Sequence, residues 1–582
     1  MKTDPDIRNY IPHDMESRIN TDLIEKEFGV QDMIMILFRD SVIITEENLL
    51  RIKKIDREIS RLSSVEKTIS LFNTKHIYSQ DGAMVVDPAV KRIPSSREET
   101  EKLRQELSEN PLAMKLVVSS DFTTAAIAAT IDKSEPEEKT LARIDSIIAA
   151  NPGRAEVFTG GLPYIRKGIL KDVKRDGLIL IPVALIIMLL FLWLAFREWK
   201  GMVLPFTVVA MSIALSMGLA PLLGWKMSII SLIVPIMLIA VANDYGIHMI
   251  AKYQEVLREN PSMRMEEIVK IVVRKLRKPV IFTGLTTIAG VLGLLTHSII
   301  PARHVGVLTA VGIAFAIVLT LFMLPAWLSM LQPGVKSVST GVPRRNMLDR
   351  LLAKVANLVI KYPVRVLVIS AILTIVCASG IFLIRVDSNQ ENFFPHKHPV
   401  RVASELISRE FGGSQNISVM VRGDIKDPEL LNKLDSWETR TGEIEGVGNV
   451  FSIAQVVKEI SKGFYDPGEE GYNKIPASRE AVSQMLEIYF MNGDPDDFER
   501  LVNWDFSKAH IIIRLSDPRT RTINNVLGEV RRMAAEDGVD AVTGGYAYIM
   551  SQFAGKIVRG QVSSILFALI VVFILLAIIF RA

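Results

Sequence analysis

The sequence predicts an α-helical polytopic membrane protein that carries two α+β domains, and three observations lead to that fold class. The first is composition: of the 582 residues, 49% are hydrophobic and 23% are charged. This mixture fits membrane helices joined to water-soluble domains. The second is a set of seven long apolar stretches, and the third is an internal repeat of about 384 residues. The net charge is only +4, so nothing in the composition indicates a nucleic-acid partner.

Seven stretches are apolar enough to cross a bilayer whose hydrocarbon core is roughly 30 Å thick. They are 178–196, 202–225, 227–250, 279–300, 305–331, 366–384 and 561–580. Two polar regions remain, and both alternate amphipathic helical runs such as REETEKLRQELSEN with β-rich runs such as DMIMILF and AHIIIRL. That alternation is typical of an α+β domain.

The two polar regions repeat each other. Residues 3–29 align with 386–412, so that Pro12 meets Pro395 at an offset of 395 − 12 = 383 and the motif Glu-Phe-Gly recurs. Further on, VFTGGLPYIRKG (157–168) aligns with AVTGGYAYIMSQ (541–552) at an offset of 541 − 157 = 384. So steady an offset indicates a duplication, a plan that many secondary transporters use.

The repeat also predicts that further segments exist. A helix at 366–384 precedes the second polar region, whereas none precedes the first. The first half continues with four more spans, whereas the second half stops at Ala582. We therefore expect this chain to be a fragment of a twelve-span protein, with one helix before Met1 and four after Ala582.

Basic loops set the predicted orientation. The loops 251–279 and 332–365 are rich in lysine and arginine, and short basic loops stay in the cytoplasm. Counting spans from either loop puts both α+β domains on the far side of the membrane. We also expect a cytoplasmic helix at the membrane surface over 255–278.

The predicted domains follow from the spans, the repeat and the orientation. They are an external domain at 1–175, a five-helix membrane bundle at 176–335, a basic cytoplasmic linker at 336–365, a membrane helix at 366–384, a second external domain at 385–560 and a membrane helix at 561–582.

The stretch AVANDYGIHMIAKY, residues 240–253, places an aspartate inside an apolar run. Asp244 lies past the middle of its span, where an aspartate costs on the order of 2.5–3.5 kcal/mol to insert. Asp244 and His248 are four residues apart, so they share one helix face, and Asn243 and Tyr245 flank the acid. Asp, Tyr and His side chains take up and pass protons, so we predict that these four residues form a proton relay.

Each of these residues also has a plainer explanation. Asp244 would serve as a structural contact to another helix, either neutral or paired. His248 lies near the cytoplasmic interface, where a histidine costs little, and Tyr245 would fit as packing. These alternatives stay open on the sequence alone.

Motifs of enzyme chemistry are not found in the sequence. It contains no GxxxxGK[ST], HExxH, CxxC or GxSxG pattern, which argues against an ATPase, a metalloprotease or a serine hydrolase. The single cysteine, Cys377, lies in an apolar run, so no intramolecular disulfide and no thiol-rich metal site is expected. An enzyme is therefore not predicted, and neither is a metal site.

The combination of the repeat, the paired α+β domains and NDYGIHMIAKYQE resembles the resistance–nodulation–division (RND) superfamily, in particular its MmpL-like branch of lipid exporters, which includes hopanoid exporters. The bundle 178–331 is also similar to the five-helix sterol-sensing-type unit. The resemblance covers essentially the whole chain.

The resemblance implies proton-driven export of a lipid or other hydrophobic substrate from a bacterial or archaeal inner membrane, with the proton gradient in place of a cofactor. Asp244 and Tyr245 match the family's first relay pair, and the second pair would lie beyond Ala582. The external domains would be porter domains with ferredoxin-like elements. Membrane lipids are expected partners, and a homo-oligomer, either a dimer or a trimer, is left open.

Two rival functions are also considered. One is a lipid or sterol-type sensor that binds without transporting. The other is an accessory factor for protein export, against which the two large and similar external domains argue.

Overall fold

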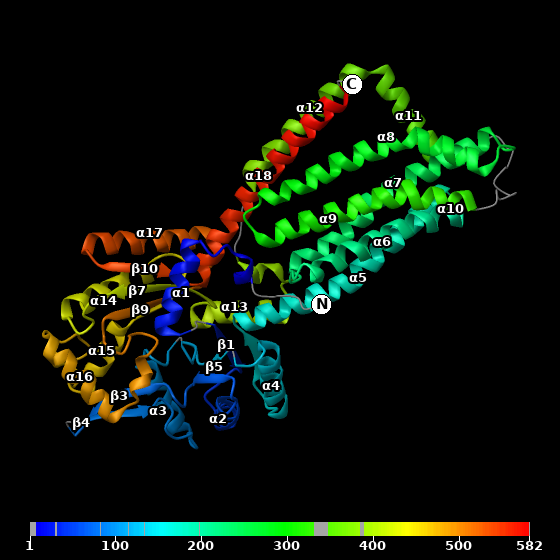
Figure 1. Cartoon of the computed structure of the whole chain (residues 1–582). Coiled ribbons are helices and arrows are strands. Elements are labelled where there is room, and N and C mark those ends of the chain that lie inside the picture. Colours follow the sequence, from blue (N-terminus) through cyan, green and yellow to red (C-terminus); the bar gives the residue numbers. More distant parts are fainter. Residues whose placement is uncertain are drawn as a thin grey trace.

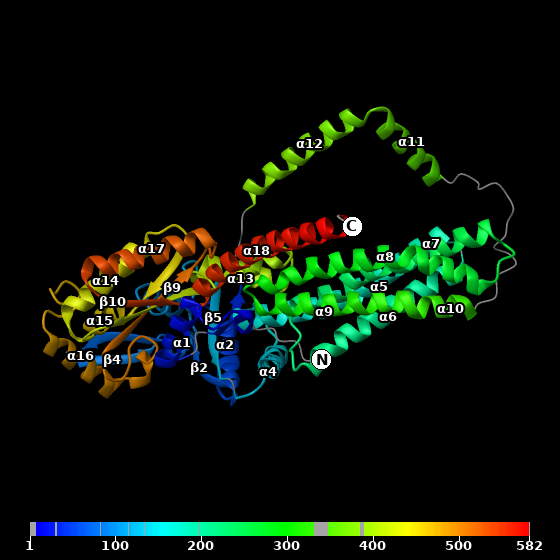
Figure 2. The same cartoon turned by 45° about the horizontal axis from the view of Figure 1, so that its top comes forward.

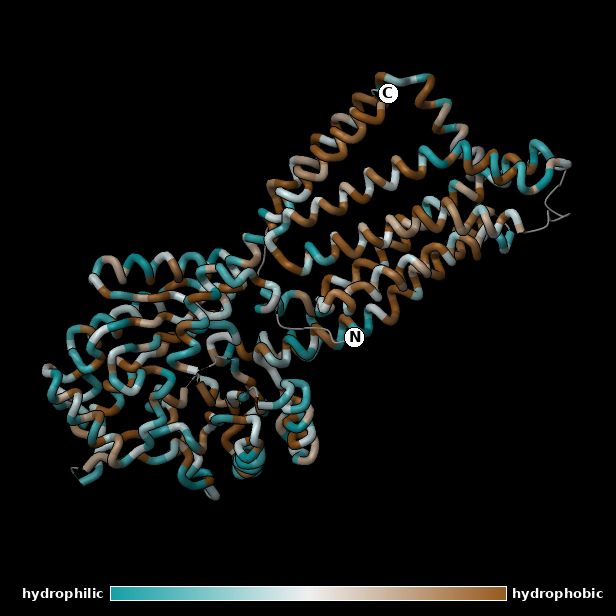
Figure 3. The backbone as a smooth tube through the Cα atoms, in the orientation of Figure 1, coloured by the Kyte–Doolittle hydropathy of each residue, from teal (hydrophilic) through white to brown (hydrophobic). Residues whose placement is uncertain are grey.

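The computed structural model describes residues 7–29, 32–81, 83–114, 116–132, 134–196, 198–330, 347–384 and 389–580. Figure 1 shows a block of sheets and short helices from which a set of long helices extends. Figure 3 shows that the long helices are mostly hydrophobic along their length, whereas the other part mixes hydrophilic and hydrophobic residues. Of the predicted linker 336–365, residues 336–346 lie outside the described residues.

Seven helices in the described chain are long and apolar enough to cross a membrane, which confirms the seven predicted spans. They are α5 (Leu162–Phe196), α6 (Trp199–Leu222), α7 (Ile233–Glu259) with η2 (Ile229–Leu232), α8 (Met265–Leu292) with η3 (Gly293–Thr296), α9 (Ile300–Val318) continued by η4 (Leu319–Met323) and α10 (Leu324–Met330), α12 (Pro363–Ser379) with η5 (Gly380–Leu383), and α18 (Tyr546–Phe580). A further helix, α11 (Met347–Lys361), precedes α12.

The predicted surface helix over 255–278 is wrong. Helix α7 continues to Glu259, and α8 begins at Met265, so residues 260–264 form a short turn between two long helices. The basic residues of this region therefore extend two membrane helices. Physically, Asn260, Pro261 and Ser262 form the turn, because they favour turns over helix.

Helix α7 lies at the centre of a five-helix bundle formed by α5, α6, α7, α8 and α9. Two glycines allow its close packing. A Cβ on Gly246 would lie 2.8 Å from Cβ of Pro205 on α6, and a Cβ on Gly312 of α9 would lie 2.7 Å from Leu238 on α7. Figure 2 shows that α12 stands apart from the bundle, in accord with its lack of buried residues.

The two α+β domains contain sheets with equivalent strands in the same order. The first sheet has the order β2-β5-β1-β6, and the second has the order β8-β9-β7-β10. The strands are β1 (Met33–Arg39), β2 (Val65–Ile69), β5 (Thr124–Ile131) and β6 (Glu156–Gly160), matched by β7 (Gln415–Arg422), β8 (Val447–Phe451), β9 (Lys508–Leu515) and β10 (Asp540–Gly544). All neighbouring strands are antiparallel.

Helices and insertions complete the domains. The first contains η1 (Ile7–Tyr10), α1 (Glu16–Phe28), α2 (Glu46–Ser60), β3 (Lys75–Gln80), β4 (Ala83–Pro88), α3 (Arg97–Ser108) and α4 (Glu137–Ala150). The second contains η6 (Gln390–Phe393), α13 (Pro399–Phe411), α14 (Pro428–Gly442), α15 (Ile453–Ser461), α16 (Arg479–Asn492), η7 (Pro495–Phe498) and α17 (Thr520–Asp537). The hairpin β3–β4 lies between β2 and β5 in the chain, and helices α15 and α16 lie between β8 and β9. These two insertions thus follow equivalent strands but differ in structure.

The domains exchange their first helices. Helix α1 packs with Ile24 and Phe28 against Met420 of the second sheet. In the equivalent contact, α13 packs with Ile407 and Phe411 against the first sheet. We call this pair of contacts the helix exchange, and it joins the two domains because each buries a helix of the other.

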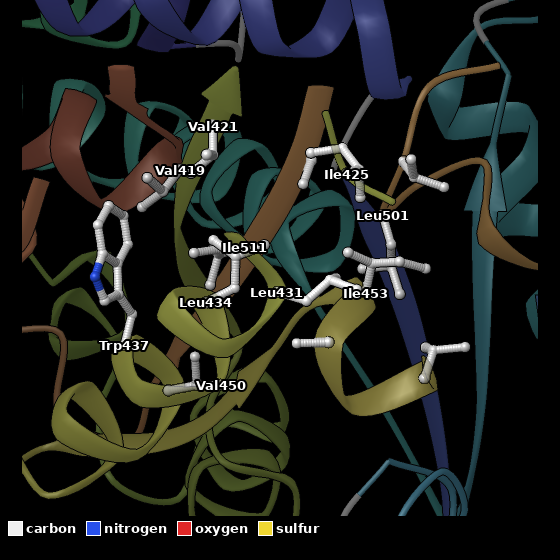
Figure 4. Close-up of a cluster of buried hydrophobic side chains, with 14 of the residues drawn as sticks. Val419, Val421, Ile425, Leu431, Leu434, Trp437, Val450, Ile453, Leu501 and Ile511 are labelled. Atoms are coloured by element: carbon white, nitrogen blue, oxygen red, sulfur yellow. The ribbon is translucent and has the colours of Figure 1, made fainter. Parts of the chain in front are cut away.

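Figure 4 shows the hydrophobic core of the second domain, in which Trp437 of α14 lies beside Val419, Val421 and Val450. The indole nitrogen of Trp437 donates a 2.7 Å hydrogen bond to Asp537, so its polar atom is satisfied. Ile77 of the hairpin β3–β4 belongs to the same cluster. This core therefore draws on both domains.

Helices α5 and α18 connect the sheets to the membrane part without a break. Each follows the last strand of its sheet and runs for 35 residues. Their first turns meet in a cluster that includes Leu162, Ile165, Tyr546 and Ile549. The predicted boundaries near 175 and 560 fall inside these helices.

Candidate functional site

Two places in the described chain gather polar groups in a way that packing alone does not require: helix α7 in the bundle, and a cavity between the two α+β domains. The first contains the residues that the sequence predicted, whereas the second was not predicted in any detail.

Asp244 and His248 lie together on one face of α7, as their spacing predicted. Nε2 of His248 is 3.5 Å from Oδ1 of Asp244, and the side chains are 62% and 52% exposed. The same face carries a stripe of exposed residues, namely Ile233, Ile236, Ala240, Ala251 and Glu255. Within the part of the chain that the structure describes, nothing covers this stripe.

Tyr245 points in another direction. It is only 2% exposed and packs inside the bundle, because consecutive residues of an α-helix are about 100° apart. Its hydroxyl would lie 3.6 Å from a Cβ on Gly284 of α8, at a place that Ile317 of α9 also reaches. The structure therefore brings Asp244 and His248 together but does not hydrogen-bond Tyr245 to either within the described residues.

Several buried polar atoms of the bundle have no hydrogen-bond partner among the described residues. Among the described residues, the Tyr245 hydroxyl and Oδ1 of Asn243 make no hydrogen bond, and the same holds for the hydroxyls of Thr309 and Thr320. Each such atom costs about 1–3 kcal/mol when it stays dry. Polar groups of this kind are the usual partners of buried water.

Sequence reasoning missed Thr309 and Thr320. Two other threonines of the bundle, Thr286 and Thr287, donate to backbone carbonyls of their own helix and are thereby satisfied. The available signal was spacing, since positions 309 and 320 are eleven residues apart, about three helical turns. Thr320 also lies in η4, a π-helical segment, and such segments often mark functional sites.

A cavity of about 500 Å³ lies between the two domains. Its walls come from both sheets and from the loops that join them to helices. The lining includes Met33, Met35, Lys67, Ile69, Leu112, Leu116, Leu162, Asn416, Asn449, Phe451, Val456, Ile512, Arg500 and Arg514. Apolar and polar groups are thus both present, as in most ligand pockets.

Equivalent rows of the two sheets reach this cavity. In the second sheet, Arg514 on β9 is paired with Asn416 on β7 and Asn449 on β8. In the first sheet, the row at the same positions is Met33, Thr130 and Lys67, of which Met33 and Lys67 line the cavity and Thr130 is buried. A polar row that contains an arginine therefore corresponds to a row with a methionine and a threonine at its centre.

Two arginines of the second domain stand out in the cavity wall. Burial lowers the pKa of Arg514 to about 10, and burial also lowers the pKa of Arg500, partly offset by the charges of Glu66 and Glu499. Arg500 donates a hydrogen bond to the hydroxyl of Thr130 in the first domain. Arg514 donates from Nη1 to the carbonyl of Phe411 at 3.3 Å.

Comparisons with known proteins agree with the membrane architecture. Residues 12–366 match the family model described as the MMPL family. A putative membrane protein of Methanocaldococcus jannaschii is 22% identical over 52% of this chain and 78% of its own length. A putative membrane protein of Streptomyces coelicolor is 28% identical over 54% of this chain and 45% of its own length.

A third relative bears a more specific name. The probable transport protein MmpL8 of Mycobacterium bovis is 21% identical over 52% of this chain. The match spans 28% of that protein, and the match to the Streptomyces relative spans 45% of its length, so each match covers less than half of the relative.

Proposed function

Because this chain belongs to the MMPL family, we propose that it works as part of a membrane transporter that exports a lipid or another hydrophobic substrate, driven by the proton gradient. A relative that carries the name of a probable transport protein supports this proposal. The cavity between the domains is the proposed place of the substrate, and Asp244 with His248 is the proposed place of the proton.

The proposal includes an orientation. Both α+β domains would lie outside the cytoplasm of a bacterial or archaeal cell, because the basic residues on either side of the turn 260–264 lie at the ends of α7 and α8 away from the sheets (Figure 1). The strand order β2-β5-β1-β6 supports a ferredoxin-like porter domain, since it follows from two βαβ units whose strands interleave. The order of the second sheet supports the same fold.

The proposed cycle begins at Asp244. Uptake of a proton neutralises the carboxylate, which lowers the cost of placing this face of α7 against an apolar neighbour. His248, 3.5 Å away, is positioned to take the proton on. A second relay pair, which the family resemblance implies, would complete the relay.

The single observation that carries the proposal is the direct connection between the walls of the cavity and the membrane helices. Both sheets that form its walls continue directly into 35-residue helices that enter the membrane part. Helix α18 also contacts the bundle closely, since a Cβ on Gly560 would lie 2.8 Å from the ring of His297. A change in helix packing would therefore reach the walls of the cavity through rigid elements.

The test is transport by the complete protein reconstituted into vesicles with an imposed proton gradient. Asp244→Asn removes the titratable group and keeps the size of the side chain, so we expect transport of a fluorescent lipid to fall at least about tenfold. Asp176→Asn is the matched control, because Asp176 is an exposed carboxylate on α5, outside the stripe of α7 that carries Asp244. Normal transport by a folded Asp244→Asn variant would refute the relay.

The same experiment separates the transporter from the lipid or sterol-type sensor. A sensor would bind the lipid equally with and without the gradient and would move none across the membrane. Gradient-dependent transport by the unaltered protein excludes the sensor.

A further inference from the structure

We propose that the cavity between the two domains selects amphiphiles with an anionic head group, which Arg514 binds with the help of Arg500. This inference rests on the proposed function, because it names the class of substrate that the cavity would take. It does not depend on how transport is driven.

The first argument is the divergence between two equivalent rows. Duplicated sheets place Thr130 and Arg514 at the same position, so the scaffold itself does not require an arginine there. Asn416 and Asn449 flank Arg514 on both neighbouring strands and line the same cavity. Amide groups beside a guanidinium add hydrogen-bond donors for a head group.

The second argument is the unsatisfied capacity of Arg514. A guanidinium has five N–H donors, and the structure gives Arg514 one hydrogen bond, to the carbonyl of Phe411. Among the described residues, no carboxylate lies within ion-pair distance of Arg514. Arg514 is half-buried and lines the cavity, so a phosphate, sulfate or carboxylate in the cavity would meet its remaining donors with paired hydrogen bonds.

The third argument is the apolar wall next to this row. One step along the same face of the second sheet, Ile512 of β9 is paired with Phe451 of β8, and both line the cavity. Met33, Met35 and Leu162 line it as well, from the first domain. A polar row bordered by apolar side chains fits a molecule with a charged head and a hydrocarbon chain.

Three acidic residues, Glu66, Asp494 and Asp497, line the cavity as well, but none of them forms an ion pair with Arg514. Asp494 accepts from the backbone amide of Asp496. Asp497 accepts a 2.8 Å hydrogen bond from Tyr489 and lies 3.4 Å from Nζ of Lys75, so it is already paired. The negative charge of Glu66 raises the pKa of Arg500 and so opposes the effect of burial. Arg514 therefore is a cation of the cavity wall with no acidic partner among the described residues. Lys67, whose Nζ donates to the carbonyl of Asp496, lines the cavity as well, and Arg500 has the secondary role.

The experiment uses the whole chain in a non-ionic detergent and three photoreactive amphiphiles with the same 14-carbon chain. One carries a phosphate head, one a phosphocholine head and one a glucoside head. Mass spectrometry of the cross-linked peptides reports where each binds, and competition reports how tightly. We expect the phosphate probe to label peptides of the cavity wall and to bind about tenfold more tightly than the other two.

Variants test the role of Arg514. Arg514→Gln should abolish the preference for phosphate, and Arg514→Lys should keep part of it, because a lysine retains the charge but not the paired donors. Arg422→Gln is the matched control, since Arg422 is an exposed arginine of the same sheet, and it should leave the preference unchanged. Thermal unfolding checks that each variant is folded.

The outcomes are distinct. Equal labelling of the cavity by all three head groups would overturn this inference and leave transport of a hydrophobic substrate standing. Cavity labelling by none of them would overturn it as well. If Arg514→Gln does not fold, the preference for the phosphate probe is compared between the unaltered chain and Arg514→Lys. An equal preference in these two proteins would then overturn the role of Arg514.

Discussion

The sheet β2-β5-β1-β6 and the sheet β8-β9-β7-β10 have equivalent strands in equivalent order, yet the rows that face the shared cavity differ. Met33, Thr130 and Lys67 stand in the first row, and Asn416, Arg514 and Asn449 stand in the second. A comparison inside one chain thus separates positions that are equivalent in the scaffold from side chains that have diverged between its two halves.

The helix exchange shows the same division. Phe28 and Phe411 are equivalent and both pack on the opposite sheet, but their contacts differ. Phe28 stacks on the ring of His510 at 5.0 Å between centroids, whereas Ala126 stands at the equivalent place under Phe411. Positions that set the path of the backbone are kept between the two halves, and positions whose side chains meet a neighbour have diverged. The following predictions test this difference.

The largest effect is expected at the second glycine of the two TGG motifs. Gly161 and Gly545 have φ values of +94° and +98°, and a Cβ would lie 2.1 Å from the carbonyl of Met33 or 2.7 Å from the amide of Ser418. Alanine at either position should lower the free energy of unfolding by roughly 3–5 kcal/mol. Thermal unfolding of the chain in detergent measures this loss.

The control for both variants is Gly528→Ala. Gly528 lies in helix α17, with open space around it, so alanine should be neutral or stabilising by up to about 1 kcal/mol. If alanine is tolerated at both 161 and 545, the repeated motif is not required for the backbone conformation at these positions, and the prediction is wrong.

The helix exchange should respond almost equally on its two sides. Ile24 and Ile407 are equivalent, and both are fully buried. Truncation of either to alanine should cost about 2–4 kcal/mol through lost burial and a cavity. Hydrogen exchange should rise in β10 for Ile24→Ala and in β6 for Ile407→Ala; exposed Ile19→Ala on α1 is the control. A rise confined to the mutated helix would argue against exchange.

A pH dependence should distinguish the two contacts, since only one contains a histidine. Burial lowers the pKa of His510 to about 4, and its Nε2 has no hydrogen-bond partner among the described residues. In the unfolded chain this histidine has a pKa near 6.5, so below that pH the unfolded state binds more protons than the folded state. Above that pH the histidine is neutral in both states and does not affect stability. Stability is then lost as the pH falls from about 6.5 to about 4.

The expected loss from this residue is about 2 kcal/mol between pH 7 and pH 5. Thermal unfolding over this range, compared between the unaltered chain and His510→Phe, isolates the contribution from that of the carboxylates. Parallel pH profiles for the two proteins would show that His510 does not titrate on unfolding.

The smallest effect is expected at an exposed ion pair across β7 and β10. Nη1 of Arg422 lies 2.9 Å from Oδ2 of Asp540, and both side chains are about half exposed. Arg422→Gln should change stability by no more than about 0.5 kcal/mol, because exposed ion pairs gain little. A loss of more than about 1 kcal/mol in the free energy of unfolding would contradict this expectation and show that the ion pair at the sheet edge stabilises the domain despite its exposure.

Sequence reasoning reached the spans and the repeat because both depend on local patterns. Apolar length predicts a membrane helix, and a constant offset predicts equivalent strands, as β1 and β7 confirm. The pairing of Asp244 with His248 followed from helical periodicity. The position of Tyr245 inside the bundle did not, because periodicity gives the angle between residues but not which face a neighbouring helix covers.

The residues that line the cavity could not be predicted from the sequence, for a similar reason. Arg514 lies in the run AHIIIRL, which predicts a strand and gives no sign of what its polar position faces. Likewise, the amphipathic pattern of α1 and α13 predicts that each buries one face, but either sheet would satisfy it. Only the fold shows that each helix crosses to the other domain.

By itself, the sequence determined the seven membrane helices, the duplication and an acid–histidine pair on one helix face, because these depend on the hydrophobic effect and on spacing along a single chain. The tertiary structure alone decided the helix exchange, the inward position of Tyr245 and the meeting of Arg514 with an apolar wall. These depend on contacts between residues that are hundreds of positions apart, and such contacts are set by how whole elements pack.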